Sequence, residues 1–133
     1  MIAQIDAEMT VRLRECAARA PTRWEGFIAE GVGYIEMALE PEISRIVLRD
    51  GPAVMGDPAS WPTANGCIKA MRDTISALIS DGVVRDIDPE ACARMLTGAS
   101  SYAAQWIANS DTPEQTAQRA TAAYRQLLEG LLR

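Results

Sequence analysis

Apolar residues recur every three or four positions along most of the chain, which is the spacing of helices with one buried face. In residues 2–20 charged side chains fill the positions between them. The apolar positions there are Ile2, Ile5, Met9, Leu13, Cys16 and Ala20. Pro21 ends this stretch, because proline interrupts a helix. Alternating apolar and polar residues never continue long enough for a strand, so we expect helices throughout.

Residues that favour helix ends divide the pattern into successive helices. Thr22 and Glu25 have the spacing of a capping box, which predicts a second helix that runs to Leu39 and breaks at Pro41. Residues 45–50 have the pattern of a short amphipathic helix, which the following Gly-Pro pair would stop.

Three longer helices follow along the sequence. The third runs from residues 57–60 to Gly82, where glycine can adopt the left-handed conformation that ends a helix. Asp88, which precedes a proline, opens the fourth helix. Thr112, with Gln115 three residues later, opens the fifth as a second capping box. Five main helices and a short one predict an all-α antiparallel bundle.

Composition fits one domain without a disulfide framework. The chain has 133 residues, and 13 basic against 18 acidic residues give a net charge of −5. An acidic chain with scattered basic residues is a poor DNA binder by itself. Cys16, Cys67 and Cys92 are odd in number and far apart, which fits neither disulfides nor a metal motif and favours the reducing cytoplasm. No apolar run reaches the roughly 18 residues that a membrane span needs.

The residue types argue against catalysis. Without histidine, the usual general base and the commonest metal ligand are missing. Ser100 and Ser101 lack a partner base, and Gly31 and Gly33 lack the third glycine of a dinucleotide-binding loop. We therefore expect neither an enzyme nor a cofactor. The two glycines fit either a close approach of another helix or ligand, or a helix that simply tolerates them.

Two groups of apolar residues are candidates for functional sites. Methionine and aromatic residues gather in the middle helices, where they either form ordinary core or line a ligand cavity between helices. The last two helices combine small residues with Leu127, Leu128, Leu131 and Leu132. These either pack inside the domain or form an exposed patch for a partner.

The sequence from Arg45 to Gly56, RIVLRDGPAVMG, followed by Trp61, resembles a string near the middle of the C-terminal domain of TetR/AcrR-type transcriptional regulators. The similarity extends over most of residues 24–132. It implies that residues 1–133 form one effector-binding and dimerisation domain. Within it, residues 1–20 would be a linker helix, residues 22–109 the pocket helices and residues 88–133 the dimerisation helices.

The resemblance also implies two sets of site residues. The ligand cavity would be lined by Phe27, Ile28, Gly31, Val54, Met55, Trp61, Ile68, Met71, Ile75, Met95 and Tyr102. The dimer interface would contain Ala99, Ala103, Ile107, Ala117, Ala120, Tyr124, Leu127, Leu128 and Leu131.

The function expected from the resemblance is ligand sensing within a transcriptional regulator. A small apolar or amphipathic effector would bind each subunit of a homodimer and, in the intact protein, control DNA binding. No helix-turn-helix precedes the domain in this sequence, so we expect no DNA binding by this chain alone, and no membrane partner. The alternative is an interaction module without a DNA-binding head that forms heterodimers with an intact regulator.

Overall fold

The computed structural model describes residues 2–44 and 62–133. Long helices account for most of these residues, together with a short 3-10 helix (η1) and one further helical turn (α3). The elements are α1 (Ile2–Arg19), α2 (Arg23–Glu36), η1 (Met37–Leu39), α3 (Pro41–Ile43), α5 (Pro62–Ser80), α6 (Pro89–Ala108) and α7 (Pro113–Glu129). The all-α prediction is confirmed. The short helix predicted at residues 45–50 and the predicted start of the third helix lie outside the described residues.

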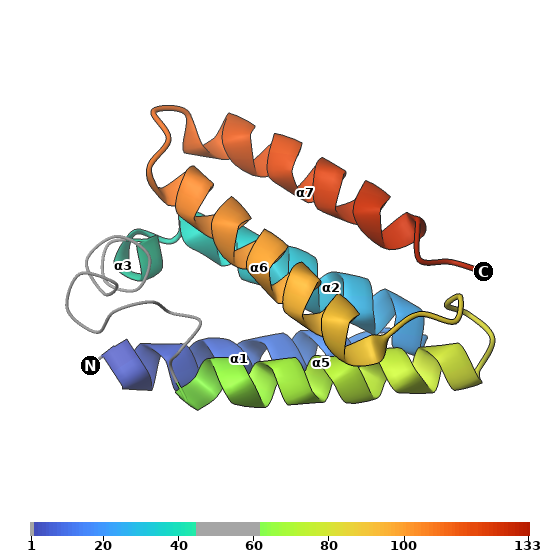
Figure 1. Ribbon diagram of the computed structural model, residues 1–133. Coiled ribbons are helices and arrows are strands. Elements are labelled where there is room, and N and C mark those ends of the chain that lie inside the picture. The colour runs from blue at the N-terminus through green and yellow to red at the C-terminus, as the bar shows by residue number, and fades with distance from the viewer. Residues whose placement is uncertain (1, 45–61) are drawn as a thin grey trace.

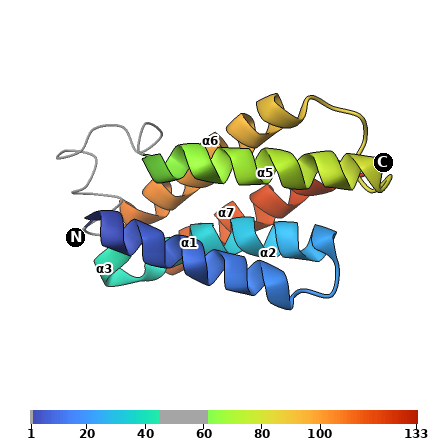
Figure 2. The same cartoon turned by 90° about the horizontal axis from the view of Figure 1, so that it is seen from below.

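Helix α2 lies at the centre of the bundle. It packs against α1 on one side and against α6 and α7 on the other, whereas α5 packs mainly against α6 (Figure 1). Figure 2, seen from below, shows α1 and α2 as antiparallel neighbours, with α5 running beside them. Each antiparallel pair is joined by a short connection, as is usual in helical bundles.

The predicted caps at the starts of α2 and α6 are present. Thr22 Oγ1 accepts a hydrogen bond of 3.1 Å from the backbone N–H of Glu25, and Asp88 Oδ1 accepts one of 3.1 Å from the N–H of Ala91. Both side chains therefore satisfy an amide that the first helical turn leaves unpaired. The chain leaves α5 through Gly82 at φ +78°, the left-handed conformation expected there.

The capping box predicted at Thr112 is wrong in its chemistry, although α7 does begin there. The Thr112 side chain makes no capping bond. Ser110 takes the polar role instead: its hydroxyl accepts a 3.0 Å bond from the Thr112 N–H and lies 2.7 Å from Thr116 Oγ1. Ser110, two residues upstream of Thr112, thus bonds the Thr112 N–H that the Gln115 side chain would reach in a capping box.

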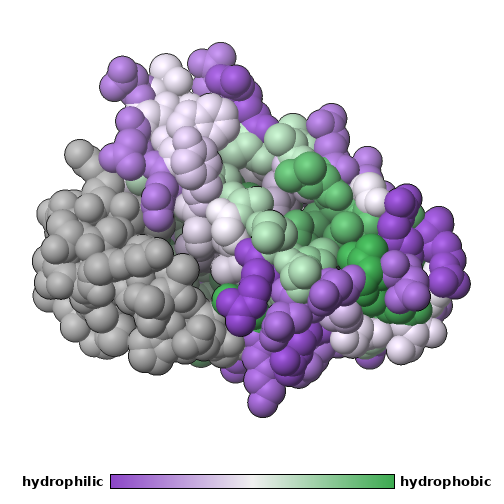
Figure 3. All heavy atoms as spheres, in the orientation of Figure 1, coloured by the Kyte–Doolittle hydropathy of each residue, from purple (hydrophilic) through white to green (hydrophobic). Residues whose placement is uncertain are grey.

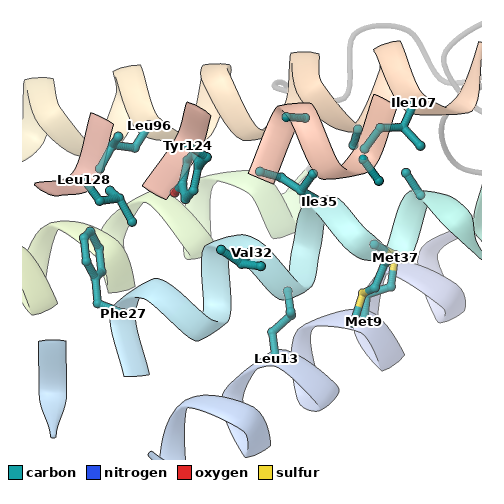
Figure 4. Close-up of a cluster of buried hydrophobic side chains, with 14 of the residues drawn as sticks. Met9, Leu13, Phe27, Val32, Ile35, Met37, Leu96, Ile107, Tyr124 and Leu128 are labelled. Carbon is teal, nitrogen blue, oxygen red and sulfur yellow. The ribbon is translucent and has the colours of Figure 1, made fainter. Parts of the chain in front are cut away.

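The core lies on two sides of α2. On the α1 side, Leu13 packs near Val32 and Met9 lies beside Met37; on the other side, Leu96, Tyr124 and Leu128 face the same helix (Figure 4). The most deeply buried large side chains, all less than 2% exposed, are Ile35, Ile75, Leu78, Val84, Ile107 and Leu128. Burial on both sides makes α2 the helix that connects α1 to the α6–α7 pair.

The end of α7 is fastened to the connection between α5 and α6. Val84 forms an isolated antiparallel bridge with Leu132. The Arg85 N–H donates to the Leu131 carbonyl at 2.9 Å, and the Arg133 N–H donates to the Val83 carbonyl at 3.0 Å. These bonds fix how α7 lies on the bundle. Among the described helices, none is both long and apolar enough to cross a bilayer.

Candidate functional site

Most of the predicted cavity residues that the structure describes lie in or against the core. Phe27 and Ile75 are buried, and Ile28, Ile68 and Met71 are half-buried and pack against the central cluster. These residues come from α2 and α5. The predicted lining residues Val54, Met55 and Trp61 lie outside the described residues.

Gly31, also predicted to line the cavity, lies against Tyr124 of α7. A Cβ at Gly31 would lie 2.5 Å from Cε2 and 2.6 Å from the hydroxyl oxygen of Tyr124, closer than real Cβ contacts allow. The glycine is therefore explained by the close approach of another helix. Tyr124 is only 3% exposed, and burial, with Cys92 and Glu30 nearby, raises the pKa of its hydroxyl to about 12. It is a neutral packing residue.

Met95 and Tyr102 are not brought together with the other predicted cavity residues. They are 74% and 72% exposed. The buried positions of α6 are Ala93, Leu96, Ser100, Ala104 and Ile107, and the helix packs against α5, α7 and α2. Met95 and Tyr102 follow a neighbouring stripe of the same helix, so they point outward.

The residues predicted for a dimer interface divide by burial. Five of them are buried within the chain itself, where they hold α6, α7 and α2 together: Ile107, Ala117, Ala120, Tyr124 and Leu128. Ala99, Ala103 and Leu131 are half-buried, and Leu127 is 58% exposed. The chain therefore uses much of this predicted set internally, and a neighbouring set of side chains faces outward.

We call that outward surface the α6–α7 face and define it by Met95, Gly98, Tyr102, Trp106 and Leu127. All five are exposed, and four are large and apolar or aromatic. Figure 3 looks onto α6 and α7 and shows green and pale atoms gathered there, with purple atoms around them. Sequence reasoning missed Trp106, although its spacing from Met95 and Tyr102 follows the same stripe.

Charge is sparse along this face. The exposed positions of α6 are Glu90, Ala91, Arg94, Met95, Gly98, Tyr102 and Trp106, and only Glu90 and Arg94 are charged. An exposed helix stripe is normally rich in charge. On α7, the Arg119 guanidinium carbon lies 5.2 Å from the centre of the Trp106 ring, in cation–π geometry. The α6–α7 face is therefore poor in charge and rich in large apolar and aromatic side chains.

The structure also has an open cleft, whose lining is more polar than that of the α6–α7 face. It lies between α1 and the η1–α3 turn and is lined by Glu8, Met9, Arg12, Glu40, Glu42 and Ile43. Arg12 crosses it with a bidentate pair to Glu40, at 3.0 and 2.8 Å. Its three carboxylates make it unlike the apolar cavity that the sequence predicts.

The fold is an all-helical bundle with a central α2 and a paired α6–α7 hairpin, and comparisons with known proteins identify its family. Residues 24–131 match the family model described as Tetracyclin repressor-like, C-terminal domain. The chain belongs to this family. It is similar to the crystal structure of a TetR-family transcriptional regulator from Pectobacterium atrosepticum, with 43% identity and a TM-score of 0.90 over 98% of this chain and 67% of that chain. No curated protein matches it.

Proposed function

We propose that this domain senses a small apolar or amphipathic effector and works as a homodimer. In a regulator that also carries a DNA-binding part, the effector would change DNA binding by preferring one arrangement of the helices over another. The observation that carries the proposal is the match to the TetR C-terminal family over residues 24–131. No enzymatic step is involved.

The described residues of the middle helices support an apolar or amphipathic effector. Half-buried apolar side chains come from α2 (Trp24, Ile28) and from α5 (Ile68, Met71), and all of them pack against the core. One polar contact at Met71 is weak, since Thr97 Oγ1 lies 3.9 Å from the Met71 sulfur. Ligand sites in helical bundles are lined in this way, with many apolar groups and few polar ones. Methionine also adapts its shape to a guest.

Binding of anilinonaphthalene sulfonate, a fluorescent amphipathic probe, tests the proposal. We expect saturable binding of about one probe per subunit. Met71→Gln should weaken it about fivefold, because it places an uncharged polar group of similar size in the lining. Met95→Gln, the same change on the exposed side of α6, is the matched control and should leave the affinity unchanged.

Two results would count against an effector site among the middle helices. Probe binding that responds to Met95→Gln and not to Met71→Gln would place the probe on the α6–α7 face. A dimer without saturable binding would favour the interaction module that forms mixed dimers. Helix content from circular dichroism confirms that each variant is folded.

A further inference from the structure

The hydroxyl of Tyr124 is buried without a hydrogen bond. The side chain belongs to α7 and is 3% exposed. Among residues 2–44 and 62–133, no hydrogen bond involves its oxygen. A hydroxyl that is buried without a partner costs free energy, and phenylalanine would fill the same space without that cost. The packing of the core therefore explains the ring of Tyr124 but not its oxygen.

The packing of α7 on α2 places this oxygen beside the apolar lining proposed for the effector. It lies 2.6 Å from the position that a Gly31 Cβ would occupy, and Figure 4 shows it directed toward α2. The Cα–Cβ bonds of a helix lean toward its N-terminus, so that position lies over the preceding turn, which contains Phe27 and Ile28. Ile28 is one of the half-buried residues of the proposed lining. The hydroxyl is thus a polar group at the edge of an apolar site.

We propose that the Tyr124 hydroxyl anchors the effector by donating a hydrogen bond to an uncharged oxygen acceptor, such as a ketone, aldehyde or ester carbonyl, on an otherwise apolar molecule. The inference rests on the proposed function and adds to it the chemical class of the effector's polar group. A site with many apolar groups takes its specificity from a few polar groups of this kind.

The surroundings of Tyr124 favour an uncharged acceptor over an anion. Burial, with Cys92 and Glu30 nearby, raises the pKa of the hydroxyl to about 12, so it keeps its proton and remains a donor at neutral pH. A carboxylate or sulfonate placed beside it would lose its hydration and would also meet the negative charge of Glu30. A ketone or ester accepts the same hydrogen bond without either penalty.

Binding of Prodan, a fluorescent naphthalene that carries a ketone and a dimethylamino group, tests the anchor. Its emission moves to longer wavelength when the ketone accepts a hydrogen bond, so the probe reports both its affinity and that bond. We expect saturable binding to the full chain. Tyr124→Phe removes only the hydroxyl and should weaken binding about fivefold, with the bound emission at shorter wavelength. Tyr102→Phe, the same change on the exposed side of α6, is the matched control and should alter neither.

Two further probes separate the anchor from the apolar lining. Dimethylaminonaphthalene lacks the ketone, so Tyr124→Phe should leave its affinity unchanged. Anilinonaphthalene sulfonate carries an anionic group that the surroundings of Tyr124 disfavour, and Tyr124→Phe should not weaken its binding either. The melting temperature of the unliganded Tyr124→Phe chain should equal that of the parent or exceed it by a few degrees, because the lost hydroxyl had no partner.

Four results would overturn the anchor. They are Prodan binding and emission unchanged by Tyr124→Phe, an equal loss of affinity for dimethylaminonaphthalene, a parent chain that binds the sulfonate probe but not Prodan, and a clearly lower melting temperature of unliganded Tyr124→Phe. The last result would mean that the hydroxyl has a partner within the folded chain. In each case, binding of the sulfonate probe that still responds to Met71→Gln would leave the proposed function standing. Absence of saturable binding of every probe would overturn both proposals.

Discussion

At Gly31, the ring of Tyr124 occupies the place that any larger residue would need. Gly31→Ala would put its Cβ between 2.5 and 2.8 Å from three atoms of that ring, which is itself held in the core. Because Tyr124 is almost fully buried, it cannot move without disturbing α2 and α7. We expect a loss of unfolding free energy of about 1–3 kcal/mol, measured by urea denaturation.

Gly98→Ala is the matched control for that substitution, since both glycines lie inside helices. The new methyl group at Gly98 meets no atom within 4 Å and should stabilise the chain by up to about 1 kcal/mol. Equal effects at the two positions would contradict the argument, because only Gly31 has a neighbour in the way.

Glu30 makes stability depend on pH. Burial raises the pKa of its carboxyl, and Arg14 opposes that shift only partly. The folded chain therefore binds this proton more readily than the unfolded chain does. The unfolding free energy contributed by Glu30 is highest when the carboxyl is protonated, and it falls as the pH rises from the unfolded pKa through the higher folded pKa.

Glu30→Gln should accordingly stabilise the chain at neutral pH, and the advantage should vanish in acid below the unfolded pKa. Solvent screens this half-exposed group, so the gain is less than about 1 kcal/mol. Thermal unfolding between neutral and acidic pH measures it. Glu36→Gln, at an exposed position of the same helix, controls for the loss of one negative charge. A variant less stable than the parent at neutral pH would refute the assignment.

At the scale of single elements, the start of α7 depends on Ser110 rather than on Thr112. The Ser110 hydroxyl bonds both the Thr112 N–H and Thr116 Oγ1, and Thr116 is buried. Ser110→Ala should therefore cost about 1 kcal/mol, because it leaves a buried hydroxyl and a backbone amide without this partner. Thr112→Ala should cost clearly less. Chemical denaturation of both variants measures these losses of stability. A larger loss for Thr112→Ala than for Ser110→Ala would support the capping box instead.

Helix boundaries could be predicted well because they depend on local chemistry. Thr22 and Asp88 cap α2 and α6 as expected, since each side chain reaches an amide only three residues away. Which side of α6 faces the core could not be predicted. Successive residues are about 100° apart around a helix, so two neighbouring stripes of α6 both show helical spacing. One contains Leu96 and Ile107, and the other contains Met95 and Tyr102. Packing against α5, α7 and α2 determines which stripe is buried.

For the molecule as a whole, the candidate site could be predicted only in part for the same reason. The contact between Gly31 and Tyr124 joins residues far apart in sequence, and nothing local in either helix marks it. Burial on both sides of α2 places this helix between α1 and the α6–α7 pair. Helical periodicity predicts a buried stripe on each helix, but it does not identify the helix against which that stripe packs.

The charge distribution of the whole chain leads to a last prediction, which concerns DNA. Nonspecific affinity comes from free basic groups that neutralise phosphates. Here the net charge is −5, and several arginines already have acidic or aromatic partners within the chain. Arg12 pairs with Glu40, Arg23 with Asp81 and Arg72 with Glu90, while Arg119 lies over Trp106.

We therefore expect no saturable binding of a labelled DNA duplex by residues 1–133 at physiological salt, measured by fluorescence anisotropy up to high micromolar protein. The chain at low salt provides the sensitive comparison, because weak electrostatic attraction strengthens as salt is removed. Submicromolar binding at physiological salt would contradict the prediction. It would mean that phosphates outcompete the internal carboxylates, and exchange of Arg12 or Arg23 for glutamine would then show which pair opens.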